Sequence, residues 1–95
     1  MSNSLWMGLV AQVPCVVCAQ LGETSPVQVH HMRTGQLGKR KSDHLTIALC
    51  PEHHQGGYSI HCDREKFERQ FGSELELMAA TVAGVELILK RKGVR

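Results

Sequence analysis

Two short patterns of metal-ligating residues constrain this chain more than any other feature. Cys15 and Cys18 enclose two residues in the segment CVVC, and after a gap of 31 residues Cys50 and His53 repeat that spacing. Two ligands with two residues between them can hold one ion from a tight turn, and two such pairs complete a tetrahedral zinc site with three sulfur ligands and one nitrogen. The patterns therefore predict a structural Zn²⁺ site that joins the two segments.

The composition explains why such a site would matter. The chain has 95 residues, which suits one small domain, and only 4% of them are aromatic. None of the aromatic residues lies between residues 7 and 57, whereas five of the six histidines and three of the four cysteines do. Because metal-binding free energy becomes folding free energy, zinc can replace part of the missing apolar core.

Other interpretations of the cysteines stay open. They could form disulfides in an oxidising compartment, but the first 14 residues carry no basic segment of the kind that begins a secretory signal. No apolar run approaches the roughly 18 residues needed to cross a bilayer, so we expect a cytoplasmic protein without membrane contact. CVVC could be a redox motif, although no thioredoxin-like strand and helix surround it. Cys62 is a second candidate for the fourth zinc ligand.

Hydrophobic periodicity predicts the elements around these motifs. Residues 1–13 are weakly apolar and are expected to form a short strand or to pack loosely. Residues 27–30 alternate apolar and polar side chains, and residues 45–49 alternate large and small ones, which predicts two strands of a hairpin. Pro51 begins a short helix that Gly56 and the glycine after it end.

The chain after residue 62 is predicted to be helical. Asp63 caps a helix that ends at Phe71, and Ser73 forms a capping box with Glu76 at the start of a second helix, which stops at Gly93. The buried stripe of that second helix is expected to contain Leu77, Thr81, Val85 and Ile88, widened by Leu75, Met78, Val82 and Leu89.

Four histidines remain as candidates for chemistry once His53 is assigned to zinc and His44 to a structural role: His30, His31, His54 and His61. His30 and His31 are adjacent at a strand end, so their side chains diverge, and one can bind metal while the other faces substrate. Three neutral imidazoles with open coordination positions are typical of a catalytic metal site. We therefore assign His30, His54 and His61 to a second ion and His31 to the general base that takes a proton from water.

These motifs resemble those of a known family. CVVC, VHHMR, DHLTIALCPEHH and the IH after a glycine loop are similar to the HNH (ββα-metal) nucleases, and most of all to the phage recombination-enhancement nucleases, which act on DNA held by a recombinase filament. The resemblance covers residues 15 to about 81. It implies that His31 activates water, that His30 and His54 bind the catalytic metal and that His53 binds the structural zinc.

The resemblance also implies a fold and a function. The expected fold is α+β, a small zinc-stabilised ββα-metal hairpin with C-terminal helices. A single nuclease domain would span residues 1–95, with both metal sites in residues 15–62 and a helical scaffold in residues 63–92. The expected activity is that of a DNA endonuclease, phage- or prophage-encoded and linked to recombination. Its catalytic ion would be Mg²⁺, Mn²⁺ or Zn²⁺.

The sequence departs from the family pattern at three points. No Asn stands at the middle position of the HNH motif, where Asp43 is the nearest residue that could brace the loop. His61 follows His54 by seven residues, whereas the family places its second helical ligand four residues on. A long basic N-terminal arm, which members of the recombination-enhancement group can carry, is not present, so a recombinase filament is only a candidate partner.

A basic segment follows the proposed general base. Arg33, Lys39, Arg40 and Lys41 lie between residues 27 and 42, which contain no acidic residue, although the net charge of the whole chain is only +2. Such side chains could contact the DNA backbone, which gives affinity without sequence information, or they could form a solvated loop. The alternative function is a non-catalytic zinc module that binds DNA or a recombination partner. A degenerate nuclease that serves as an accessory domain is a third.

Overall fold

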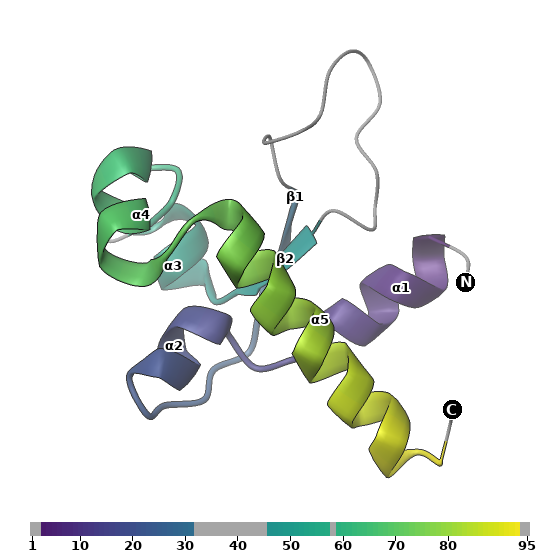
Figure 1. The fold of residues 1–95 in the computed structure, drawn as a ribbon. Helices are drawn as coiled ribbons and strands as arrows, with labels where there is room; N and C mark the ends of the chain where they lie inside the picture. The colour runs from purple at the N-terminus through teal and green to yellow at the C-terminus, as the bar shows by residue number, and fades with distance from the viewer. Residues whose placement is uncertain (1–2, 32–45, 58, 94–95) are drawn as a thin grey trace.

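The fold is a two-stranded sheet surrounded by helices. The computed structural model describes residues 3–31, 46–57 and 59–93. Its elements in chain order are α1 (Asn3–Val10), α2 (Val16–Gln20), β1 (Gln28–His31), β2 (Thr46–Leu49), α3 (Pro51–Gln55), α4 (Arg64–Phe71) and α5 (Glu74–Arg91). Helix α5 crosses the sheet, and α1 lies beside the C-terminal half of α5 (Figure 1). Within the described residues, no helix is both long and apolar enough to cross a membrane.

The predicted hairpin strands are confirmed. β1 and β2 pair antiparallel, with His30 opposite Ile47 and His31 opposite Thr46. All four residues of β2 are buried, whereas β1 is buried fully only at His30. Because side chains alternate along a strand, Gln28 shares a face with His30, and His31 points to the other face.

Helix α5 packs on β2 through the expected stripe. Leu77, Thr81 and Val85 are buried, and the Thr81 hydroxyl accepts a hydrogen bond from the Ala48 N–H at 3.2 Å while donating to the Leu77 carbonyl at 3.0 Å. Leu75 does not belong to the buried stripe, contrary to the prediction, since its side chain is 55% exposed. Two residues along a helix turn the side chain by about 200°, so Leu75 lies opposite Leu77.

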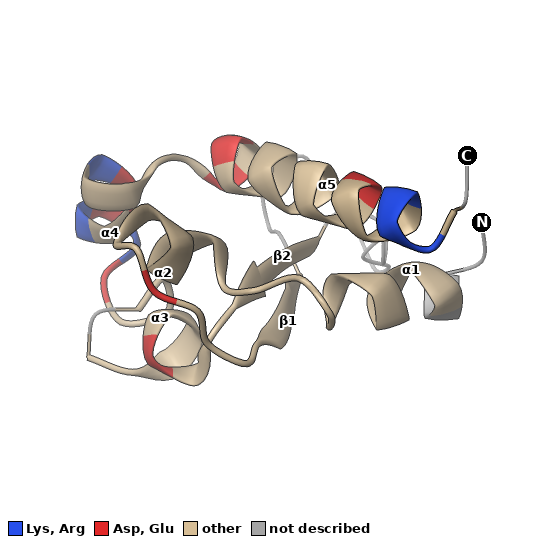
Figure 2. Ribbon diagram, turned by 90° about the horizontal axis from the view of Figure 1, so that it is seen from below, with Lys and Arg blue, Asp and Glu red and all other residues tan. Residues whose placement is uncertain are grey.

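The predicted helix ends are also confirmed. The Ser73 side chain accepts from the Glu76 N–H, and the Glu76 carboxylate accepts from the Ser73 N–H, each at 3.1 Å. The Asp63 carboxylate accepts from the Lys66 N–H at the start of α4. Acidic residues occupy the first turn of α5 and basic residues its last turn, which complements the helix dipole (Figure 2). Gly72, with φ of 117°, allows the reversal between α4 and α5.

The expectation for residues 1–13 is wrong, because Asn3–Val10 of this segment forms the helix α1. Trp6, Leu9, Val10 and Val13 recur at intervals of three or four residues, which is the helical period. Leu9, Val10 and Val13 are buried in the core, and the Trp6 indole donates a hydrogen bond to the hydroxyl of Thr46 at 3.1 Å. Packing against α5 and β2 therefore gives this weakly apolar segment a helical structure.

The close approach of α5 to the chain after α1 gives a prediction for two helical glycines. A Cβ at Gly84 would lie 2.7 Å from Cγ1 of Val13, whereas a Cβ at Gly8 would meet no atom within 4 Å. Val13 is buried and β-branched, so it cannot easily move. We expect Gly84→Ala to lower the free energy of unfolding by about 1–2 kcal/mol, and Gly8→Ala to raise it by up to about 1 kcal/mol. Urea denaturation measures both, and equal stabilisation by the two substitutions would contradict this packing.

Candidate metal centres

The first cluster joins two segments that are distant in sequence. Cys15 caps α2, Cys18 lies within α2, Cys50 directly precedes α3, and His53 lies within α3. All four side chains are buried, and their ligand atoms lie within 4.8 Å of one another. The structure thus brings together the four residues that the two spacings predicted. This cluster could bind a metal ion such as zinc.

The distances within the cluster fit tetrahedral coordination. Nδ1 of His53 lies 3.2 Å from Sγ of Cys50, 3.5 Å from Sγ of Cys18 and 3.7 Å from Sγ of Cys15. The Sγ atoms of Cys18 and Cys50 are 3.7 Å apart. A tetrahedron with zinc–sulfur bonds of about 2.3 Å and a zinc–nitrogen bond of about 2.0 Å has ligand separations of about 3.8 and 3.5 Å. The cluster therefore has the dimensions of a closed four-ligand site.

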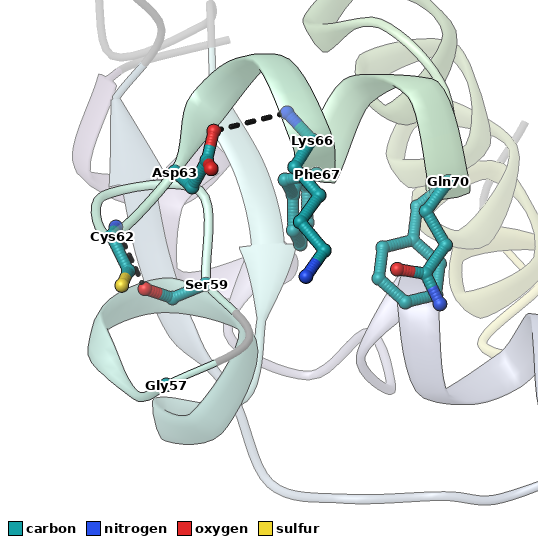
Figure 3. Close-up of a pocket in the computed structure, with 8 residues that line it drawn as sticks. Gly57, Ser59, Cys62, Asp63, Lys66, Phe67 and Gln70 are labelled. Atoms are coloured by element: carbon teal, nitrogen blue, oxygen red, sulfur yellow. Dashed lines mark hydrogen bonds between the residues drawn. The ribbon is translucent and has the colours of Figure 1, made fainter.

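The same distances argue against the other interpretations of these cysteines. The 3.7 Å between the Cys18 and Cys50 sulfur atoms is far longer than a disulfide bond of about 2.05 Å, and all four cysteines are free. Cys62 is exposed and does not belong to the cluster. It lines a separate pocket of about 170 Å³ beside α4, together with Lys66 and Gln70 (Figure 3). The structure therefore places His53, and not Cys62, with the other three ligands.

Local hydrogen bonds prepare the cluster for thiolate ligands. The Cys18 N–H points to Sγ of Cys15 at 3.4 Å, and the Ser25 hydroxyl donates to Sγ of Cys18 at 3.4 Å. Burial raises the pKa of the Cys18 thiol to about 11, and the Ser25 hydrogen bond opposes this rise. A metal ion must therefore displace a proton from this thiol, so binding is coupled to proton release.

The second cluster consists of His30, His54 and His61, whose ligand nitrogens also lie within 4.8 Å of one another. β1 supplies His30, α3 supplies His54, and the segment between α3 and α4 supplies His61. The ring centres are 4.8–5.1 Å apart. His30 is buried, His54 half-buried and His61 exposed, so the cluster opens to solvent on the His61 side. A pocket of about 130 Å³ reaches it there, lined by His30, Ile60, His61, Arg64 and Glu74.

Two of these histidines are held by neighbouring polar side chains. The Gln28 carboxamide oxygen lies 2.8 Å from Nδ1 of His54, and the Glu74 carboxylate lies 2.9 Å from Nε2 of His30. Because the Gln28 oxygen can only accept, Nδ1 of His54 carries its proton and Nε2 keeps a lone pair. Contacts of this kind orient histidine ligands in metal sites.

The surroundings of the cluster keep two of its imidazoles neutral. Burial lowers the pKa of His30, against the opposing effect of the Glu74 carboxylate. Burial, followed by the charges of His30 and His61, lowers the pKa of His54 to about 4. Neutral imidazole is the form that binds a metal ion. His30 and His54 are therefore in the ligand-competent form near neutral pH.

Of the remaining predicted site residues, the structure describes only His31. His31 ends β1 and is half-buried, on the face of the sheet opposite His30. Its role as general base stays a prediction. The proposed DNA-contacting residues and the two loop residues with open roles lie outside the described residues: Arg33, Lys39, Arg40, Lys41, Asp43 and His44.

Sequence reasoning missed three residues around the second cluster: Gln28, Arg64 and Glu74. Two of them left a signal. Gln28 stands two residues before His30 in the same strand, and therefore on the same face. Glu74 stands three residues before Leu77 on α5, so a carboxylate lies on the buried face of the helix. The link from Arg64 to the cluster depends on a contact between two helices, which the sequence does not show.

Comparison with known proteins identifies a family. Residues 1–86 match the family described as "Protein of unknown function (DUF968)". The chain belongs to this family. Neither a curated protein nor a solved structure matches the chain. Membership in DUF968 therefore assigns no activity, and the functional argument rests on the geometry of the two clusters.

If the first cluster binds a structural ion, substitution of a cysteine inside it should destabilise the protein far more than substitution of a cysteine outside it. Cys18→Ser removes a ligand, so we expect the purified protein to lose one metal ion per chain and to be largely unfolded. Structural zinc contributes about 10–16 kcal/mol in small domains, which is as much as the whole stability of a typical domain. Cys62→Ser is the control, and its stability should change by less than about 0.5 kcal/mol. Metal analysis and thermal unfolding measure both effects. An unchanged metal content and melting temperature for Cys18→Ser would refute the site.

Proposed function

We propose that this DUF968 member is a metal-dependent DNA endonuclease of the HNH (ββα-metal) type. The observation that carries the proposal is a second, open cluster of three histidines beside a complete four-ligand cluster. One structural ion does not use these additional histidines. A closed site for stability and an open site for chemistry are the two forms that metal sites of this kind take. In this proposal, Zn²⁺ occupies the first site and Mg²⁺, Mn²⁺ or Zn²⁺ the second.

The arrangement of the ligands supports the ββα-metal type. The antiparallel pair β1–β2 is followed directly by α3, and the second cluster takes one ligand from the first strand and one from the helix. His53 and His54 are consecutive in α3, so one helix contributes to both clusters. This is the order in which the resemblance distributes ligands between the structural and catalytic ions.

The chemistry can be divided among the side chains. A divalent ion, when bound, supplies a Lewis acid that polarises a phosphoryl oxygen and stabilises the leaving oxygen. His30, His54 and His61 would hold it, and His31, the next residue of the same strand, would take the proton of the attacking water. As the water oxygen bonds to phosphorus, the bond from phosphorus to the leaving oxygen breaks. Arg64 lines the pocket at the cluster, from which its guanidinium could contact a phosphate oxygen.

The proposal extends to the biological setting. The basic segment with Arg33, Lys39, Arg40 and Lys41 would hold the DNA backbone, and a recombinase filament is a candidate partner. A cytoplasmic, phage- or prophage-encoded enzyme that acts in DNA recombination fits the resemblance.

One observation favours the alternative of a non-catalytic zinc module. Among the described residues, every buried side-chain nitrogen and oxygen already has a hydrogen-bond partner. The His30–Glu74–Arg64 contacts could therefore be a structural polar network that binds no ion. The two functions differ in metal content, because the nuclease binds two ions per chain and the module one.

The nuclease proposal predicts the loss of DNA cleavage in His31→Ala. Removal of a general base lowers a rate by about 10²- to 10⁴-fold. We expect plasmid nicking by the wild type with at least one of Mg²⁺, Mn²⁺ or Zn²⁺, a fall of that size in His31→Ala, and an unchanged rate in Cys62→Ser. Equal nicking by the wild type and His31→Ala would disprove the assigned mechanism. DNA binding without cleavage under every metal would instead favour the accessory role.

A further inference from the structure

Glu74 makes two polar contacts that the proposed function does not use. This residue is the first of α5 and is only 2% exposed. Its two carboxylate oxygens have different partners, since Oε2 lies 2.9 Å from Nε2 of His30 and Oε1 lies 2.6 Å from Nη2 of Arg64. His30 is equally buried, with 3% exposure. A buried carboxylate thus contacts a histidine of the open cluster.

The chemistry of this contact determines which nitrogen of His30 is free. An ionised carboxylate has no proton to donate, so Nε2 of His30 must be the donor. A neutral His30 then carries its only ring proton on Nε2 and keeps a lone pair on Nδ1. The rings of His54 and His61 lie with their centres 5.1 Å from that of His30.

We propose that Glu74 is a positioning residue that presents Nδ1 of His30 to a divalent cation held by His30, His54 and His61. The inference rests on the proposed function only in that this cluster binds an ion. Glu74 does not belong to the ligand group itself. It acts through His30 by holding the ring in one orientation and one tautomer, as carboxylates do behind histidine ligands in metal sites.

Arg64 keeps Glu74 in the form that this role requires. An isolated buried carboxylate would be costly and would take up a proton, whereas the guanidinium beside Oε1 favours the ionised form. The position of Glu74 in the first turn of α5 has the same effect, because the helix dipole favours a negative charge there. Arg64 thus binds Oε1, while Oε2 is the oxygen that contacts His30.

This division of the two oxygens predicts a specific effect of Glu74→Gln. Arg64 can only donate hydrogen bonds, so the single carboxamide oxygen of Gln should stay with Arg64. The amide NH₂ then faces Nε2 of His30 and donates to it. The ring proton of His30 must move to Nδ1, where it points toward the cluster and blocks the lone pair.

Two measurements on the full-length chain test the proposal, and neither requires DNA cleavage. Long-range ¹H–¹⁵N correlation spectra of the protein with zinc in the cysteine cluster alone give the tautomer of His30. Titration of the metal-free protein with Co²⁺ restores the fold as the cysteine cluster fills and separates the sites, because thiolate-to-cobalt charge-transfer absorption reports the cysteine cluster and later binding without that band reports the histidine cluster. Glu86→Gln is the matched control, since Glu86 is an exposed residue of the same helix.

We expect a proton on Nε2 of His30 in the wild type and in Glu86→Gln, and a proton on Nδ1 in Glu74→Gln. Affinity for the second Co²⁺ should fall about 10- to 100-fold in Glu74→Gln while the charge-transfer band persists. A proton on Nδ1 in the wild type would overturn the proposal even if Glu74→Gln fails to fold. The proposal would also be overturned if a folded Glu74→Gln variant bound the second Co²⁺ with an affinity within threefold of the wild type. Failure of the wild type to bind a second ion would overturn it as well. If the tautomer and the Co²⁺ affinities are as expected but no DNA is cleaved, the nuclease function is refuted and the role of Glu74 stands.

Discussion

The rest of this structure depends on the contact between two short segments that carry cysteine and histidine ligands. Cys15 and Cys18 belong to the segment before the sheet, and Cys50 with His53 to the segment after it. An ion bound by these residues would tie the two segments together and so close a long loop. The second cluster would depend on this closure. Helix α3 has only five residues and would not be stable alone, so metal binding by His53 would fix the position of its neighbour His54.

Helix α5 provides the other support for the open cluster. The capping box of Ser73 and Glu76 sets the first residue of the helix, and this places Glu74 on its buried face. The Thr81 hydroxyl then bonds the backbone of β2, which holds the helix on the sheet that carries His30. The capping box at the start of α5 thus determines where the Glu74 carboxylate lies relative to His30. The contacts that hold α5 on the sheet therefore also set the geometry of the second cluster.

The features that could be predicted from the sequence are those whose signals lie within a few consecutive residues. The CxxC and CxxH spacings, the caps at Asp63 and Ser73 and the alternation in β1 each involve a few consecutive residues. The prediction for residues 1–13 failed because it overlooked the helical period of Trp6, Leu9, Val10 and Val13, and the partners of this face, α5 and β2, are distant in sequence. The contact of Glu74 with His30 joins residues 44 positions apart. No spacing rule reports such a contact, so the polar residues behind the histidines became visible only in the fold.

The central claim is that the chain holds two ions, in two ligand sets that share α3. Anomalous diffraction from crystals grown with Zn²⁺ and Mn²⁺, measured at both absorption edges, tests it most directly. We predict one zinc peak between Cys15, Cys18, Cys50 and His53, and a second metal peak between His30, His54 and His61. A single peak at the cysteine cluster, with the three histidines bound only to protein groups, would contradict the claim.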